Sequence, residues 1–138
     1  MSSEIIKYKG LRYRQNKSLR YLEVIIDNDT LSNNENYVFA ISNVAEFTIY
    51  IRPMYLVINL LNSSFRINKD LIGFTKNNIL RPLHEYNVQK VIFLVDDSVY
   101  NENYFEIKEK DPLYTMFKNV DDMNKWITEN SPNANPKK

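Results

Sequence analysis

The chain has 138 residues, of which 43% are hydrophobic and 25% charged, and its formal net charge is +1. This composition is that of an ordinary globular domain, without the excess charge that would draw it to nucleic acid, an anionic membrane or an acidic substrate. The absence of cysteine excludes disulfides, thiolate nucleophiles and cysteine-ligated metal centres. No apolar run approaches the ~20 residues of a membrane span, and no secretory leader is visible. We expect a single cytoplasmic domain over residues 1–130, followed by a disordered tail over 131–138.

Two strands, over residues 11–15 and 20–27, are predicted to form a hairpin whose turn lies at residues 16–18. In the second strand Leu22, Val24 and Ile26 alternate with more polar neighbours, so only one face is apolar and the pair should lie toward a sheet edge.

This N-terminal region also interleaves cations with tyrosines, a pattern typical of single-stranded nucleic-acid binding. The residues are Lys7, Lys9, Arg12, Arg14, Lys17 and Arg20, with Tyr8, Tyr13 and Tyr21. We interpret them as the solvated charges of an edge strand, which oppose edge-to-edge pairing, and expect no nucleic-acid partner.

A first helix is predicted to begin at a capping box formed by Ser32 and Glu35 and to end before Pro53. Its core-facing stripe is predicted to be Val38, Ile41, Ala45 and Ile49. Four aromatic residues lie off that stripe: Tyr37, Phe39, Phe47 and Tyr50. Either the domain covers this helix on two sides, or the helix presents an aromatic patch to a partner protein or to a second copy in a homodimer.

The segment from residue 55 to residue 95 reads as strand, helix, strand. Residues 55–61 and 90–95 are short apolar runs typical of strands buried on both faces, and 68–86 has helical length and spacing. Strands joined through a helix normally lie parallel with a right-handed crossover. Pro82 should kink the helix near Asn78, and Asn87 suits the left-handed position after its end.

The C-terminal part predicts a third helix near 99–108, a strand over 113–118 and a last helix capped within 119–122. Whether residues 100–110 are an ordered helix or a mobile lid stays open at this point. Together these elements predict one α/β domain, with about five strands in a mixed sheet and helices packed against it.

Three segments carry a resemblance to a known family. Residues 52–60 read RPMYLVINL, residues 78–93 contain NILRPL and NVQKVIF, and residues 117–127 read FKNVDDMNKWI. They are similar to the central strand, the proline-containing helix with its following strand, and the closing helix of STAS-like (SpoIIAA-like) bacterial domains. The resemblance covers residues 19–130 and implies that fold and a regulatory, protein-binding role.

One departure affects what the resemblance implies. Antagonists of that superfamily carry a phosphorylatable serine at the start of the helix after the central strand, where this chain has Lys69 or Asp70. A phosphorylation switch at that helix N-terminus is therefore not expected. Ser63 and Ser64 lie upstream but do not match the position.

Two further features were considered as reactive sites. Asp96 and Asp97 follow a central strand at the edge where open α/β sheets bind ligands, and they suit Mg²⁺; equally, they suit the start of the next helix. His84 is the only histidine, and without a second histidine, a cysteine or a nearby catalytic serine it indicates no familiar metal site or catalytic triad; we interpret it as a surface or packing residue.

We therefore expect a non-catalytic interaction or regulatory module without a cofactor. Its candidate partner-binding residues are Tyr37, Phe39, Phe47, Tyr50, Lys69 and Asp70. One alternative is a binder of a small apolar ligand or lipid, lined by Phe65, Phe74, Phe93 and Phe105. The other is a metal-dependent enzyme that uses Asp96 and Asp97.

Overall fold

The computed structural model describes residues 5–27, 34–63, 73–97 and 113–130, which form one α/β domain. Its sheet has six strands in the order β1-β2-β3-β4-β5-β6. The strands are β1 (Ile5–Tyr8), β2 (Leu11–Asn16), β3 (Tyr21–Asp27), β4 (Tyr55–Asn62), β5 (Lys90–Leu94) and β6 (Tyr114–Phe117). The helices are α1 (Asn34–Ile51), the π-helical turn η1 (Lys76–Leu80), α3 (Arg81–Glu85) and α5 (Val120–Asn130). The predicted fold class is confirmed, with one strand more than expected.

The additional strand is β1, which pairs antiparallel with β2 at the sheet edge. It is four residues long and only partly buried, so its hydrophobic pattern is weak. The turn that joins the two strands has positive φ at both Lys9 (51°) and Gly10 (84°), as in a type I′ hairpin. Lysine at the first of these positions is uncommon, and the sequence therefore did not indicate a hairpin.

The parallel pairing of the two central apolar runs is confirmed. β4 and β5 lie side by side in the same direction, with Leu56 opposite Val91 and Ile58 opposite Phe93. β3 and β6 continue the parallel arrangement on either side, while β1, β2 and β3 are antiparallel. The sheet is mixed, and its antiparallel half contains the predicted hairpin.

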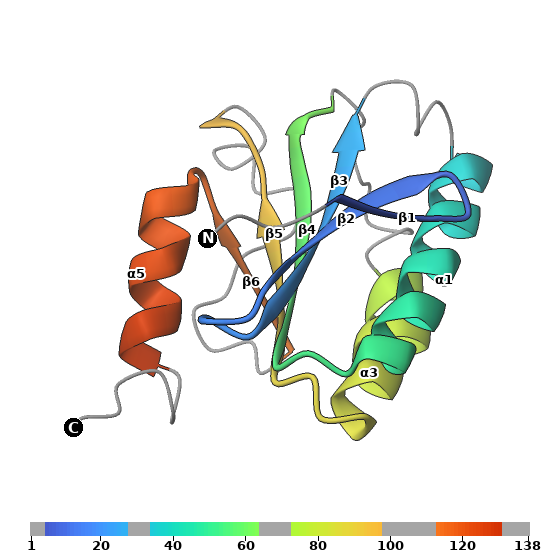
Figure 1. Ribbon diagram of the computed structural model, residues 1–138. Coiled ribbons are helices and arrows are strands. Elements are labelled where there is room, and N and C mark those ends of the chain that lie inside the picture. Colours follow the sequence, from blue (N-terminus) through green and yellow to red (C-terminus); the bar gives the residue numbers. More distant parts are fainter. Residues whose placement is uncertain (1–4, 28–33, 64–72, 98–112, 131–138) are drawn as a thin grey trace.

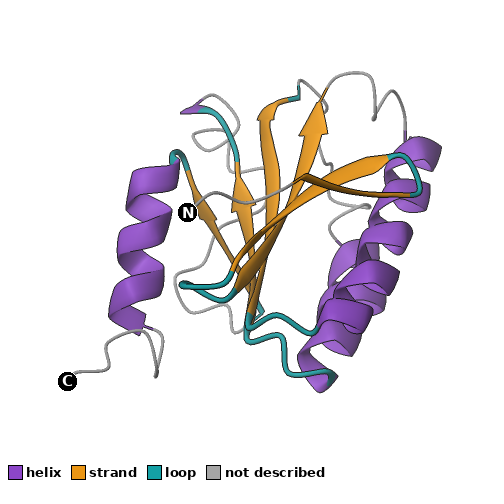
Figure 2. Ribbon diagram, in the orientation of Figure 1, coloured by secondary structure: helices purple, strands orange, loops and turns teal. Residues whose placement is uncertain are grey.

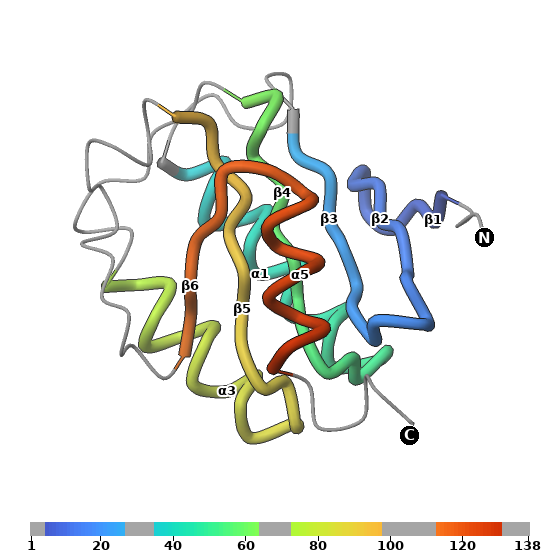
Figure 3. Tube along the Cα trace, turned by 90° about the vertical axis from the view of Figure 1, so that its left-hand side faces the viewer, coloured from blue at the N-terminus to red at the C-terminus, as the bar shows by residue number. Residues whose placement is uncertain are grey.

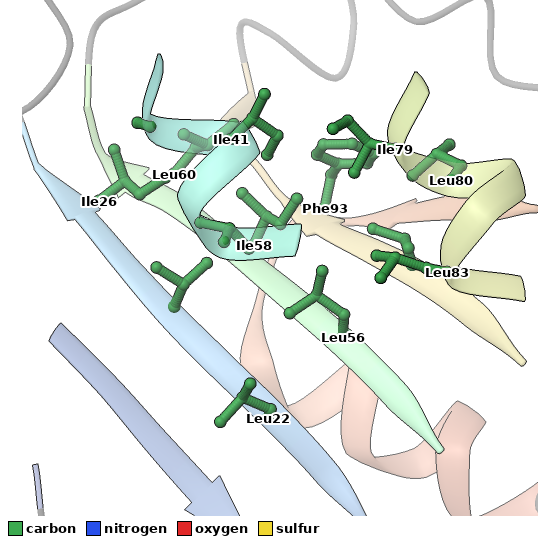
Figure 4. Packing of buried hydrophobic residues seen from close by; sticks show 14 of the residues in the cluster. Leu22, Ile26, Ile41, Leu56, Ile58, Leu60, Ile79, Leu80, Leu83 and Phe93 are labelled. Atoms are coloured by element: carbon green, nitrogen blue, oxygen red, sulfur yellow. The ribbon is translucent and has the colours of Figure 1, made fainter. Parts of the chain in front are cut away.

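Helices cover both faces of the sheet. α1 and α3 pack on one face and α5 packs on the other (Figures 1 and 2). Alternate residues of β4 therefore enter two separate cores: Leu56 and Ile58 point toward α1 and α3, while Tyr55 and Val57 belong to the cluster under α5. The larger core is seen in Figure 4, where Phe93 lies beside Ile79. This two-sided burial explains why β4 and β5 are continuous apolar runs.

The ends of the described helices follow the predicted local chemistry. Arg52 has a φ of 58° and its N–H donates to the Thr48 carbonyl (2.7 Å), which ends α1 directly before Pro53. Asn87 takes the same left-handed conformation (76°) after α3. Asn119 caps α5, because its Oδ1 accepts a hydrogen bond from the Asp122 N–H (2.8 Å).

The helix that contains Pro82 is irregular where the proline predicts it. The π-helical turn η1 ends at Leu80, and α3 follows with Pro82 in its first turn. Proline has no N–H and its ring crowds the preceding turn, so a wider turn accommodates it. The predicted start of this helix at residue 68, the capping residue Ser32, the helix near 99–108 and the tail at 131–138 all lie outside the described residues.

Candidate functional site

The outward face of α1 carries two strongly exposed aromatic side chains. Phe39 is 70% exposed and Tyr50 is 81% exposed. They are eleven residues apart, three helical turns or about 16 Å along the axis, so they lie on the same side of the helix. Ser42 and Glu46 are exposed between them. We call these four residues the outer α1 face.

Tyr37 and Phe47, the other two aromatic residues of the predicted patch, are buried, so the patch is smaller than predicted. The Tyr37 hydroxyl is 2.7 Å from Thr75 Oγ1, and burial raises the pKa of Tyr37. The Phe47 ring packs on Tyr8 and Tyr13, with centroid distances of 4.9 and 4.5 Å. Both side chains belong to the core between α1 and the sheet.

The reason is a rotation of α1 relative to the predicted stripe. Tyr37, Ile41, Val44 and Thr48 form the buried stripe, while Val38, Ala45 and Ile49 are only partly buried. The polar Thr48 interrupts the apolar spacing that would have predicted this stripe. Thr48 is nevertheless buried, because its hydroxyl donates a hydrogen bond to the Val44 carbonyl (2.7 Å).

An ion pair holds the outer α1 face against the β1–β2 turn. Lys9 Nζ lies 3.0 Å from Glu46 Oε1. This hydrogen bond raises the pKa of Lys9 and lowers the pKa of Glu46. Both side chains are more than half exposed, so the pair orients the two groups rather than contributing much stability.

The two aromatic side chains differ in their surroundings. Phe39 lines an apolar depression of about 440 Å³ with Glu35, Val38 and Ser42. The Tyr50 ring stacks on the buried Phe47 at a centroid distance of 6.3 Å. A partner that covers this face would therefore find a ring stacked on the core at Tyr50 and an apolar depression beside Phe39.

Asp96 and Asp97 lie at the surface of the described structure, beside Lys118. Asp96 and Asp97 are both exposed, and Asp97 Oδ1 lies 3.7 Å from Lys118 Nζ. Among the described residues no group of three or more histidine, cysteine, aspartate or glutamate side chains gathers to hold a metal ion. His84 is exposed, with its Nδ1 3.3 Å from the Val88 carbonyl oxygen.

Of the four residues proposed to line an apolar cavity, Phe74 and Phe93 lie in the described part of the chain, and both belong to the core under α1 and α3. Phe93 is fully buried and its ring meets Tyr114 edge-on at 5.9 Å, so it fills the core. Phe74 is partly buried at the rim of that core. Phe65 and Phe105 lie outside the described residues, as do Lys69, Asp70 and Ser64, whereas Ser63 is buried.

One charged site could not be predicted from the sequence. A pocket of about 500 Å³ lies at the end of the sheet where the parallel strands begin. It is lined by three segments: the hairpin between β2 and β3, the connection from α1 to β4, and the connection from α3 to β5. Lys17, Arg20 and Arg52 line it. These cations come from separate segments, and only the tertiary arrangement brings them together.

Among the described residues, no helix is long and apolar enough to cross a membrane. No protein-family model, curated protein or solved structure matches the chain. Its function is therefore argued from the arrangement of its side chains.

Proposed function

We propose that this protein is a non-catalytic interaction module that binds a partner protein through the outer α1 face. The observation that carries the proposal is the exposure of Phe39 and Tyr50 on one side of a helix whose opposite side is packed in the core. Aromatic residues are enriched among the residues that dominate protein–protein binding energy.

The energetics favour this use of the two side chains. Phe39 keeps 70% of its surface in solvent, so it contributes little to folding. Covering the two rings with a partner would remove them from water at a gain of roughly 1–3 kcal/mol each. Glu46 lies between the two rings and its charge is paired with Lys9 at 3.0 Å, so a partner would meet a neutralised carboxylate there.

The resemblance of residues 19–130 to STAS-like domains supports the same class of function, because such domains act by binding other proteins. Lys69 and Asp70 stand where the phosphorylatable serine of that family is expected. We therefore propose a constitutive binding surface, which is not switched by phosphorylation at this position.

Photo-crosslinking from within the surface tests this proposal. Benzoylphenylalanine would replace Phe39 or Tyr50 in the full chain, in its native cells, and Lys125 on the exposed side of α5 would be the matched control position. We expect the same discrete adduct from positions 39 and 50 and not from position 125; mass spectrometry would identify the partner or a second copy of the chain.

Affinity for the identified partner then tests the contribution of each side chain. Phe39→Ala and Tyr50→Ala should each weaken binding by roughly tenfold or more, as expected for interface hot spots. Lys125→Ala should leave the affinity unchanged. Crosslinking from position 125 but not from positions 39 and 50 would contradict the proposal.

A further inference from the structure

A basic pocket is lined by residues at the end of the sheet where β3, β4 and β5 begin. Figure 1 shows the starts of these strands at the lower end of the sheet. Its volume is about 500 Å³. Lys17, Arg20 and Arg52 contribute three positive charges, and no acidic residue is among the residues that line it. The pocket shares neither Phe39 nor Tyr50 with the outer α1 face, so it is independent of the proposed protein interface.

Main-chain hydrogen bonds fix the connections that carry these cations. The Arg20 carbonyl accepts hydrogen bonds from the N–H groups of Met54 (3.0 Å) and Tyr55 (3.2 Å). The Met54 carbonyl accepts one from the Gln89 N–H (2.7 Å). The hairpin, the α1–β4 connection and the α3–β5 connection are thereby joined, and the backbones of Arg20 and Arg52 are held in place before any ligand binds.

The backbone conformation of the two arginines is unusual. Arg20 (φ 65°) and Arg52 (φ 58°) are both left-handed, as is Asn87 (76°), which also lines the pocket. Three of the four non-glycine residues with positive φ in the described chain therefore lie around this one pocket. Glycine or asparagine adopts this conformation with less strain than arginine. Arg52 and Asn87 take this conformation where α1 and α3 end, so an arginine at position 52, in place of glycine or asparagine, adds a cation to the pocket at a cost in backbone strain.

We propose that this pocket binds the phosphate group of a small organic phosphate monoester. A guanidinium presents parallel N–H donors that match phosphate oxygens, and two guanidiniums with a lysine suit a dianion. The Arg52 guanidinium lies over the Tyr86 ring, 5.6 Å from its centroid, which limits its freedom. Ile51, Pro53 and Met54 line the same pocket and offer an apolar wall to the rest of the ligand.

Titration calorimetry with phenyl phosphate tests the site in the full chain at physiological salt. We expect saturable binding in the millimolar range or tighter, weaker binding of inorganic phosphate, and none of phenol. Arg20→Gly and Arg52→Gly should each weaken phenyl phosphate binding by roughly tenfold, because each removes a charge-assisted pair of hydrogen bonds. Their melting temperatures should not fall by more than a few degrees, because glycine relieves the left-handed strain. If Arg20→Gly does not fold, Arg20→Asn takes its place in the binding measurement, because asparagine also tolerates positive φ.

Lys9→Gly is the matched control. Lys9 is the fourth residue with positive φ (51°) and lies at the opposite end of β2, so the substitution makes the same change of charge and backbone away from the pocket. Its phenyl phosphate affinity should stay within about twofold of the native value. The proposal is overturned if the native chain shows no saturable binding, if Lys9→Gly weakens binding as much as the arginine variants, or if inorganic phosphate binds as tightly as the ester.

Discussion

Removing the hydroxyl from two buried tyrosines is expected to change stability in opposite directions. Tyr13 and Tyr37 are both fully or almost fully buried. The Tyr37 hydroxyl has a hydrogen bond of 2.7 Å to Thr75 Oγ1, whereas the Tyr13 hydroxyl has no hydrogen-bond partner among the described residues. Phenylalanine keeps the ring and removes the hydroxyl alone, so the two substitutions isolate the energetic effect of that hydrogen bond.

The magnitudes follow from the state of each hydroxyl. A buried polar group without a partner costs about 1–3 kcal/mol, so Tyr13→Phe should raise the free energy of unfolding by about 1 kcal/mol. A satisfied hydrogen bond contributes about 1 kcal/mol net, so Tyr37→Phe should lower the free energy of unfolding by at least that amount. For a chain of this length 1 kcal/mol corresponds to a shift of roughly 3 °C in melting temperature.

Urea unfolding at neutral pH, followed by the fluorescence of Trp126, measures both values. Trp126 is the only tryptophan, and its ring lies 5.9 Å from both Tyr55 and Phe117, so it reports on the packing of α5. Tyr50→Phe is the matched control, because Tyr50 is exposed and its hydroxyl stays in solvent. A decrease for Tyr13→Phe equal to that for Tyr37→Phe would refute the argument from the unpaired hydroxyl.

Three further substitutions or conditions test the fold. Burial raises the pKa of Tyr37 above its ordinary value of 10.0. As the pH rises, the unfolded chain therefore loses this proton before the folded chain does. The free energy of unfolding should fall above about pH 10, by up to ~1.4 kcal/mol per pH unit. Urea melts between pH 9 and 11 should therefore show a shallower fall in Tyr37→Phe than in the native chain. Asn119→Ala removes the cap of α5 and should lower the free energy of unfolding by about 1 kcal/mol, whereas Glu129→Ala at the other end of α5 should change it by less than about 0.5 kcal/mol. Leu56→Ala empties a fully buried position on the central strand and should cost about 2–5 kcal/mol in the same assay; a loss below about 1 kcal/mol would contradict the packing described here.

The elements that could be predicted from sequence are those whose signal is local. The apolar runs of β4 and β5 indicated burial on both faces, and the two cores, one under α1 and α3 and one under α5, confirm it. Asn87 and Asn119 marked the end of α3 and the start of α5, because their side chains suit those backbone conformations. The outward position of Phe39 and Tyr50 was predicted as one of two alternatives.

The features that were missed depend on contacts between distant segments. The face that α1 turns to the sheet is decided by the partners of Tyr37 and Phe47, which are Thr75 on the following helix and Tyr8 on β1. Neither contact has a signature within α1, so spacing alone left both aromatics off the predicted core-facing stripe, with burial and exposure both open. The basic pocket was missed for the same reason, since its cations come from connections that meet only in the folded chain.

On the α5 side of the sheet, the described side chains are apolar beneath the helix and polar beside it. Seen from that side, α5 lies over β4 and β5 and leaves β2 beside it (Figure 3). On the half that α5 does not cover, Arg14 stands opposite Glu23, and Glu23 is only 6% exposed. Its carboxylate accepts a hydrogen bond from Asn59 Nδ2 (2.7 Å) and lies 3.8 Å from Arg14 Nη1.

A buried carboxylate is tolerated only where it is paired, and here the neighbouring strands supply both partners. Arg14 on β2, Glu23 on β3 and Asn59 on β4 thus satisfy one another across the sheet. On the opposite face of β3, every second residue is apolar: Leu22, Val24 and Ile26 pack in the core under α1. The position of α5 follows from the strands as well, because β4 and β5 place Tyr55, Val57, Ile92 and Leu94 beneath it, where Met123 and Ile127 pack.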